Sequence, residues 1–234
     1  MSSNNRYRPQ YKYILKLREN VKGDSKIFNF KKKKWSALVA RVTSSHSYKF
    51  FNHSLYRVSR NAKPLKNLYR SQLATKQRLN FFYGKLTDKY LKTVSRRSFV
   101  KSKLKSTQQA AVDLFLNSLE TRLDVSIYRS YFTSSISTAK QWITHGNVYV
   151  NNNKVFSSNY SLKQGDLIQV SKKMHCIIQQ NVFQSKLWPR PPVHLEINFK
   201  VFHIYKIQNI SFINLCGSFP FWLNLKSVLS HYKV

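Results

Sequence analysis

The alternation of apolar and polar residues along the chain predicts three helical segments. From Leu65 to Tyr90, apolar side chains recur at helical steps with basic side chains between them, which indicates a buried face and a basic outer face. A second apolar stripe, from Gln108 to Tyr131, predicts a core helix or helix pair. A third, shorter helix is predicted to begin at an N-capping Ser137 and to end at His145-Gly146.

Short strands are predicted to follow the third helix. Val148–Val150 and Val155–Phe156 flank Asn151–Asn153, and because asparagine tolerates the left-handed backbone of tight turns, these residues predict a hairpin. A turn at Gly165-Asp166 then leads into a strand at Leu167–Val170. The remaining predicted elements are a proline-stiffened connector at 188–192, strands at 194–202 and 207–213, and a terminal helix at 225–232. The fold class is therefore α+β.

The N-terminal segment, residues 1–64, lacks this periodicity. It contains the charge run Lys31–Lys34 and the aromatic Trp35 directly after it. Aromatic residues are unusual in tails that stay disordered, so we expect extended arms and short helices that become ordered on a partner. The predicted organisation is a basic N-terminal arm (1–64), a basic helical domain (65–119), a module of two helices and a small curled sheet (120–172), and C-terminal strands with a helix (173–234).

The charge balance points to a polyanionic partner. The chain holds 41 Lys and Arg residues against 8 Asp and Glu residues, a formal charge of +33 with a pI near 10.4. Self-repulsion on this scale destabilises a lone compact state, and a nucleic acid partner removes it. Residues 1–112 carry 28 basic and 3 acidic side chains, and the remaining residues carry 13 and 5. The N-terminal half therefore supplies most of the electrostatic attraction.

Composition also argues against a membrane, a metal and catalysis. No run approaches the roughly 18 consecutive apolar residues of a membrane-spanning helix. Cys176 and Cys216 lack zinc-site spacing, so two buried free thiols are favoured over a disulfide, and no metal or other cofactor is expected. Asp124 is predicted to hold a neighbouring group in place and His145 to lie at a helix end, since carboxylates that could form an acid–base pair are scarce. We therefore expect no enzyme activity.

The segment from Glu120 to Ser171 carries a series of motifs in a fixed order and spacing. Its matching positions are Arg122-Leu123-Asp124, Tyr128-Arg129, Ser135, Ala139, His145-Gly146, Val150-Asn151, Tyr160 and Gly165-Asp166. In this order they resemble the S4 family of RNA-binding domains. Such domains also occur in proteins similar to pseudouridine synthases, tyrosyl-tRNA synthetases and a small heat-shock ribosome-rescue protein. The module thus implies RNA binding without fixing the protein's function.

A second resemblance narrows the choice. Residues 69–91 resemble the helix that precedes the module in the S4 family of small-subunit ribosomal proteins, and the residues in register are Leu73, Lys76, Gln77, Leu79, Phe81, Tyr83 and Gly84. Residues 6–13 and 194–200 resemble the same family more weakly. Four positions depart from its pattern. Ile136 stands where the family has Arg, and Lys140 cannot form the two-pronged phosphate contact of an arginine. Ser158 and Asn159 stand where the family has Pro and Ser before the tyrosine of the sheet.

The resemblance implies a structural protein of a small ribosomal subunit. Its expected partners are small-subunit rRNA, which it would bind at a multi-helix junction early in assembly, and neighbouring ribosomal proteins, with mRNA as a further partner near the path by which mRNA enters. No membrane is expected. Because the family-like start lies within the first ten residues, no room is expected for a cleavable presequence, which favours a mitochondrial ribosomal protein encoded in the organelle. A plastid or a bacterial cytoplasm is the alternative location.

Two other function classes stay open on the sequence. One is an RNA-modifying enzyme of the pseudouridine-synthase type, which would need an aspartate nucleophile and an added catalytic domain. The other is a free RNA-binding regulator built on the same module. For the ribosomal interpretation the predicted rRNA contacts are Arg6, Arg8, Lys12, Lys76, Arg78, Lys85, Arg122, Arg129, Ser135, Thr138, Lys140, His145, Lys154 and Lys163.

Overall fold

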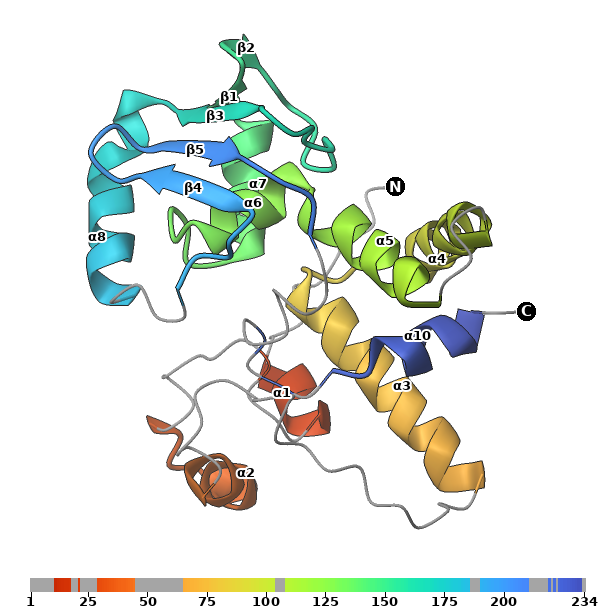
Figure 1. Ribbon diagram of the computed structural model, residues 1–234. Coiled ribbons are helices and arrows are strands. Elements are labelled where there is room, and N and C mark those ends of the chain that lie inside the picture. The colour runs from red at the N-terminus through yellow and green to blue at the C-terminus, as the bar shows by residue number, and fades with distance from the viewer. Residues whose placement is uncertain are drawn as a thin grey trace, which may run out of the picture. The chain divides into compact units, whose positions relative to one another are not determined.

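The computed structural model describes residues 11–17, 21, 29–44, 65–103, 108–185, 190–210, 219, 221 and 223–232 (Figure 1). Two compact units are present, one formed by residues 1–85 with 219–228 and the other by residues 86–218 with 229–234. The boundary between them falls between Lys85 and Leu86, and the four-part division expected from sequence stays a prediction. No helix in the described ranges is long and apolar enough to cross a membrane.

Helices make up the described part of the first unit. These are α1 (Tyr11–Leu17), α2 (Lys33–Ser44) and α3 (Leu65–Phe82). The prediction of short helices in the N-terminal arm is confirmed where the arm is described, and Trp35 packs against Phe30 with ring centroids 4.8 Å apart. The end of α3 is held by aromatic packing, since the ring of Phe82 lies 5.4 Å from that of Phe219 and 5.7 Å from that of Phe221.

The first predicted helix was too long. It ends at Phe82 instead of Tyr90, because Gly84 and Lys85 take left-handed φ values of 78° and 60° and the Lys85 amide donates back to the Asn80 carbonyl at 2.9 Å. A separate helix, α4 (Asp88–Lys103), then includes most of the basic stretch from Arg96 to Lys105, for which no helix was predicted. Its buried face contains the serines Ser95, Ser98 and Ser102, so the periodicity of apolar residues does not reveal this helix.

The second apolar stripe forms a helix pair. Helices α5 (Gln108–Glu120) and α6 (Leu123–Arg129) are separated by Thr121 and Arg122. The predicted core positions are all buried, namely Val112, Phe115, Leu116, Leu119, Leu123 and Ile127. The break occurs where the chain bonds to a distant loop, because Leu162 donates to the Thr121 carbonyl and Leu123 donates to the Tyr160 carbonyl, both at 2.9 Å.

Helix α7 (Ile136–Thr144) corrects the predicted capping residue. Its N-cap is Ser135, whose hydroxyl oxygen accepts a hydrogen bond from the Thr138 amide at 3.2 Å, whereas Ser137 lies inside the helix and is exposed. The predicted end is confirmed, since His145 is the C-cap and Gly146 has a φ of 69°.

Five short strands form one antiparallel sheet. They are β1 (Val148–Val150), β2 (Asn153–Lys154), β3 (Leu167–Val170), β4 (Leu195–Asn198) and β5 (His203–Lys206), in the order β2-β1-β3-β5-β4. The predicted hairpin turn is confirmed, with Asn151 and Asn152 at φ values of 50° and 66°, but the prediction of its second strand is wrong, because that strand is Asn153–Lys154 and not Val155–Phe156. The strand at Leu167–Val170 is also confirmed.

The predictions for the C-terminal strands were partly wrong. The segment 194–202 contains β4 and then a turn, in which the Lys200 and Val201 amides donate to the Asn198 side chain. Residues 207–210 are not a strand, because the pairing partner of β3 is the preceding segment, β5; residues 211–213 lie outside the described ranges. Part of the 188–192 connector also lies outside them. The terminal helix, α10 (Leu225–Tyr232), has the predicted bounds.

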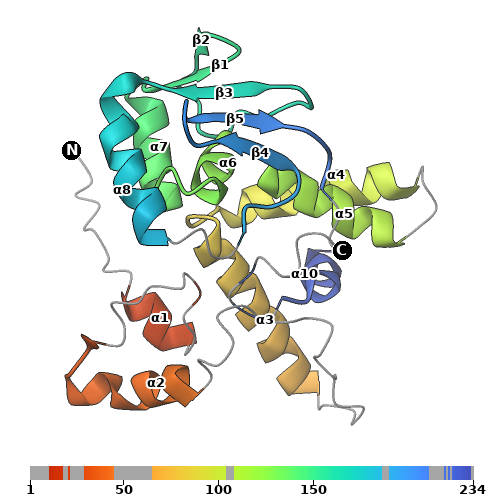
Figure 2. The same cartoon turned by 60° about the vertical axis from the view of Figure 1, so that its left-hand side comes forward.

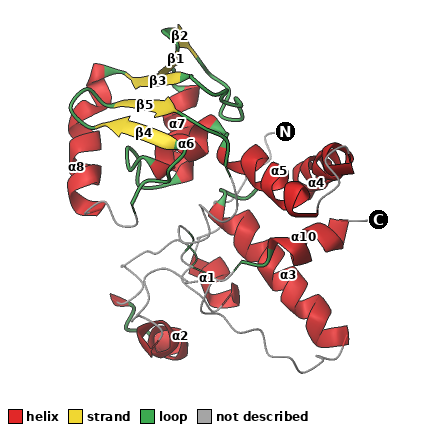
Figure 3. Cartoon of the chain, in the orientation of Figure 1, coloured by secondary structure: helices red, strands yellow, loops and turns green. Residues whose placement is uncertain are grey.

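One side of the sheet packs against three helices. In Figures 2 and 3, α6, α7 and α8 (His175–Ser185) all lie on the same side of the five strands. The core between them includes Leu123, Ile127, Ala139, Ile143, Val150, Ile168, Ile178 and Ile204. The sequence did not predict α8, which buries only Ile178 completely, and Cys176 on this helix is exposed, so the expectation of two buried thiols is wrong for Cys176. Cys216 lies outside the described residues.

The two serines at the start of α7 give a direct test of the capping assignment. We expect Ser135→Ala to lower the free energy of unfolding by about 1 kcal/mol, because the Thr138 amide loses its acceptor. Ser137→Ala should cost nothing, since alanine is the better helix former at an interior exposed position. Urea unfolding of both variants measures the difference, and equal losses would contradict the assignment.

Candidate nucleic-acid interface

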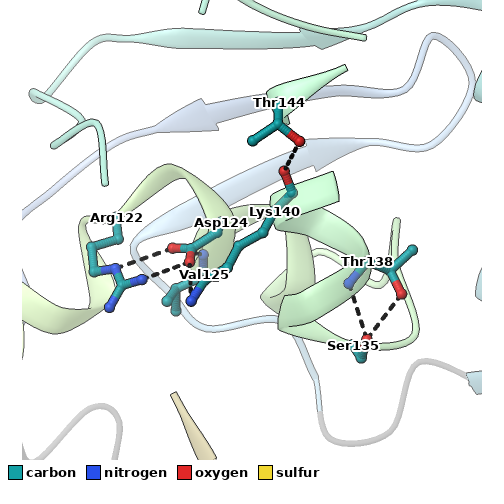
Figure 4. A network of polar contacts seen from close by, with 7 residues as sticks. All are labelled: Arg122, Asp124, Val125, Ser135, Thr138, Lys140 and Thr144. Carbon is teal, nitrogen blue, oxygen red and sulfur yellow. Dashed lines mark hydrogen bonds and ion pairs between the residues drawn. The ribbon is translucent and has the colours of Figure 1, made fainter. Parts of the chain in front are cut away.

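The Arg122-Leu123-Asp124 motif at the start of α6 contains an internal ion pair. The Arg122 guanidinium donates to both carboxylate oxygens of Asp124, from Nη2 at 2.6 Å and from Nε at 3.2 Å, as Figure 4 shows. The two residues are 1% and 0% exposed. Burial raises the pKa of Asp124, and the Arg122 guanidinium and the Lys140 ammonium oppose that rise. The predicted structural role of Asp124 fits this geometry.

A second buried pair joins the two helices of the core. The Arg129 guanidinium donates to Glu120 from Nη2 at 2.6 Å and from Nε at 3.1 Å, which links the end of α6 to the end of α5. Arg129 is 7% exposed and Glu120 is fully buried. Arg122 and Arg129 were both predicted to contact RNA. Their guanidinium groups are engaged inside the module, so we attribute to both a structural role and look elsewhere for the RNA-binding surface.

Three predicted contacts gather at the first turns of α7. Ser135, Thr138 and Lys140 are all half-buried, and the two hydroxyl oxygens lie 2.9 Å apart (Figure 4). Lys140 reaches toward α6, with its Nζ 3.9 Å from an Asp124 oxygen. Burial lowers the pKa of Lys140, and the Asp124 carboxylate works against that shift. Ser135 and Thr138 thus pair with each other at the start of α7, whereas Lys140 extends toward Asp124.

The remaining predicted contacts of the module are exposed. His145 lies at the end of α7, Lys154 lies on β2, and Lys163 precedes the turn into β3. The turn after Lys163 is rigid, because the Lys163 amide donates to the Asp166 carboxylate at 2.7 Å and the Asn151 amide group donates to it at 3.0 Å. Exposed cations on fixed backbone segments are suited to phosphate contacts.

The candidates outside the module belong to the first unit. Lys76 and Arg78 are half-buried on α3, and Lys85 is exposed just after it. Lys12 lies in α1, and Arg6 and Arg8 lie outside the described residues. Within the module, Arg122 and Arg129 are buried, while His145, Lys154 and Lys163 are exposed on separate elements. The six residues of the first unit remain predictions.

Metal and acid–base chemistry find little support in the described ranges. No group of three or more His, Cys, Asp or Glu side chains that could hold a metal ion occurs there. The best-buried carboxylates, Asp124 and Glu120, each receive two hydrogen bonds from an arginine. A carboxylate held in this way supports structure and is poorly placed to exchange protons with a substrate.

A buried histidine escaped the sequence analysis. His194 is 4% exposed, and its Nε2 has no hydrogen-bond partner among the described residues. Burial lowers its pKa to about 4, although the nearby Glu120 carboxylate works in the opposite direction. Nothing in the local sequence marked this residue, and the charged groups that act on it, Glu120 and Arg129, precede it by more than sixty positions.

Comparison with known proteins finds the same module and relatives that the chain matches over part of their length. The S4 domain family matches residues 121–168. Small ribosomal subunit protein uS4 of Mesomycoplasma hyopneumoniae is 35% identical over 138 residues, which cover 57% of this chain and 64% of the relative. The uS4 protein of Cereibacter sphaeroides is 36% identical over 103 residues, or 44% and 47% of the two chains.

A longer match comes from a plant. Small ribosomal subunit protein uS4m of Marchantia polymorpha is 30% identical over 171 residues, which cover 70% of this chain and 82% of the relative. The chain thus spans less than two thirds of the bacterial relatives and more than two thirds of the plant relative. The similarity therefore extends well beyond the module.

The Arg122–Asp124 pair predicts a large loss when one partner is neutralised. Asp124→Asn should lower the free energy of unfolding by about 3 kcal/mol, because it leaves the Arg122 guanidinium buried without an opposite charge. Glu196→Gln is the control, since Glu196 is exposed and its loss should cost less than about 0.5 kcal/mol. Urea unfolding measures both, and similar small losses would show that the pair is not needed.

His194 predicts a defined pH dependence of stability. Its pKa is about 4 in the folded chain against about 6.5 unfolded, so the unfolded chain takes up the proton first as pH falls. The free energy of unfolding should therefore fall between about pH 6.5 and pH 4, by about 3 kcal/mol from this residue. His194→Leu should remove that part of the loss, and His145→Leu, at an exposed position, should retain it. The free energy of unfolding is measured from pH 7 to pH 4 for the unaltered chain and both variants. An equal fall in all three would contradict the assignment.

Proposed function

This chain belongs to the family of small ribosomal subunit protein uS4, and on that premise we propose that it is a structural constituent of a small ribosomal subunit that binds small-subunit rRNA. The observation that carries the proposal is the S4 module, whose exposed lysines and half-buried hydroxyls lie on a hydrogen-bonded scaffold in a chain of charge +33. Phosphate contacts of this kind fix position and supply affinity, and the shape of the folded RNA supplies selectivity.

The finer features of the role are also part of the proposal. The protein binds a multi-helix junction of the rRNA early in assembly, contacts neighbouring small-subunit proteins, and lies close to the path of the incoming mRNA. Its location is the mitochondrial ribosome, in keeping with the similarity to the uS4m protein of Marchantia polymorpha. Cell fractionation, followed by detection of the protein in mitochondrial small subunits, tests the location.

An RNA-modifying enzyme is the weaker alternative. The chain has the five aspartates Asp24, Asp88, Asp113, Asp124 and Asp166. Asp124 is bonded to Arg122 and Asp166 to the backbone of its own turn, so neither is placed as a nucleophile toward RNA. Assay of uridine isomerisation with the purified protein tests this alternative, and recovery from ribosome-free fractions tests the free regulator.

The salt dependence of RNA binding tests the electrostatic part of the proposal. If roughly ten phosphates are neutralised, the logarithm of affinity for small-subunit rRNA should fall with the logarithm of salt concentration with a slope of about −7 to −9. Lys154→Gln with Lys163→Gln should make this slope less steep by about 2, one step for each phosphate contact removed. The control is Lys200→Gln in the turn between β4 and β5, which should change it by less than about 0.5.

Filter binding across a salt series gives the slopes, and sedimentation with small subunits in low salt gives the physiological context. A protein that fails to sediment with small subunits in low salt is not the ribosomal protein proposed here. If the double substitution leaves the salt dependence of affinity unchanged, the chain still binds rRNA, but Lys154 and Lys163 do not contact it.

A further inference from the structure

The side of the sheet that faces away from the helices carries a row of residues that crosses all five strands. Strand register pairs Lys154 with Tyr149, Tyr149 with Gln169, Gln169 with His203, and His203 with Asn198. Side chains alternate between the two faces of a strand. Val150 and Ile168, which follow Tyr149 and precede Gln169 and pair with each other, lie in the core. The row therefore lies on the opposite face, which we call the outer sheet face.

A second row extends this surface. Tyr205 is paired with Leu167 on one side and with Glu196 on the other, and Tyr205 is 41% exposed. Helices α6, α7 and α8 lie on the other side of the sheet in both Figures 1 and 2. The outer sheet face thus consists of Lys154, Tyr149, Gln169, His203 and Asn198, together with Leu167, Tyr205 and Glu196.

An exposed phenylalanine adjoins the first row. Val155 turns toward the core, which directs Phe156 to the same side as Lys154, and the Phe156 ring is 58% exposed. The Lys154 ammonium lies 5.8 Å from the centre of that ring. Both side chains rest against Gly146, where an added Cβ would lie 2.7 Å from Lys154 and 2.9 Å from Phe156. A cation and an aromatic ring are thereby held together at the end of α7.

The chemistry of this face suits unpaired nucleotides. Tyr149, His203, Tyr205 and Phe156 offer rings on which bases can stack, and stacking on aromatic side chains needs bases that are free of a duplex. Gln169 and Asn198 offer amide groups that donate to and accept from base edges. Lys154 supplies a cation beside the rings for the phosphate that joins two bases.

The charge around the face also favours RNA over a protein. Lys163 is exposed before β3, and Lys172 and Lys173 are exposed directly after it. Glu196 is the one acidic residue in the two rows. A surface rimmed by lysines in a chain of charge +33 attracts a polyanion and repels the basic proteins that accompany RNA.

The face is preorganised for binding. Each strand that carries it is bonded to its neighbours, and the loop from β2 to β3 is fixed to α6 through the Tyr160 carbonyl and to the sheet through the Asp166 carboxylate. The buried Lys206 ammonium adds a 2.6 Å hydrogen bond to the Leu162 carbonyl of the same loop. Side chains on such a support lose little conformational entropy when RNA binds.

We propose that the outer sheet face is a binding site for single-stranded RNA, on which unpaired bases stack against Tyr149 and Phe156 while Lys154 holds the connecting phosphate. This inference rests on the proposed function, RNA binding by the module, and adds to it the aromatic sheet face beside Lys154, which is one of the proposed rRNA contacts, and a class of RNA. The sheet then has two roles, since its inner face supports α6 and α7 and its outer face binds RNA directly.

The test compares two RNAs on the full chain at one salt concentration. The probes are a fluorescein-labelled oligouridine of about 12 nucleotides and an RNA duplex of about 12 base pairs, lengths within the range that small single-strand-binding sites cover. Tyr149→Leu with Phe156→Leu removes both rings and keeps apolar side chains. Tyr149→Phe with Phe156→Tyr is the matched control that keeps the rings. Phe183→Leu, at an 85% exposed position on α8, controls for loss of an exposed ring elsewhere.

We expect the double leucine variant to bind the oligouridine at least about tenfold more weakly, while its affinity for the duplex changes less than about twofold. Both controls should bind the oligouridine within about threefold of the unaltered chain. Phe156→Leu alone, which changes a largely exposed side chain, should lose about fivefold and serves if the double variant proves less stable in thermal unfolding.

Four results would overturn the inference. Oligouridine binding that is unchanged in the leucine variants would assign the face to another occupant, such as a neighbouring protein. Equal losses for both RNAs would show a general effect on the module instead of stacking. An unaltered chain that binds small-subunit rRNA and the duplex but not the oligouridine would remove this site while the proposed function stands, whereas one that binds none of the three RNAs would remove both.

Discussion

The buried ion pairs at the two ends of α6 are the constraint on which the rest of the S4 module depends. Arg122 with Asp124 fixes the start of this short helix, and Arg129 with Glu120 ties its end to α5. A helix of seven residues has little stability of its own, so its position must come from such contacts and from core packing. Since α7 and the sheet both pack on α6, the geometry of the outer surfaces follows from these pairs.

Arginine and lysine have different roles in the module, as these pairs show. A guanidinium group is planar and weakly hydrated, so it can be buried against a carboxylate with two parallel hydrogen bonds. An ammonium group is strongly hydrated, and Lys154 and Lys163 stay at the surface where water and phosphate can reach them. The arginines of the family motif are thereby explained by folding, and the surface is left to lysine and hydroxyl groups.

Sequence patterns predicted the elements that local chemistry decides. The asparagine turn of the hairpin, the strand at Leu167–Val170 and the bounds of α10 all follow from turn residues or apolar periodicity. Sequence patterns did not predict burial that depends on distant partners. The buried face of α4 contains serines, so its helical pattern was not recognised, and no local pattern predicted the burial of His194. Motif matching likewise found Arg122 and Arg129, but only the fold reveals that both face inward.

Burial of acidic residues makes the surface more positive than the composition alone indicates. Of the six acidic residues in the described ranges, Glu120, Asp124 and Asp166 are buried, where each accepts hydrogen bonds within the module. Their charges are partly cancelled by the groups they bind, and little of their field reaches the solvent. The exterior therefore presents cations with few carboxylates to offset them. Because exposed charges attract phosphate over the distance that salt screening allows, burying the acids and exposing the lysines together produce a surface suited to RNA.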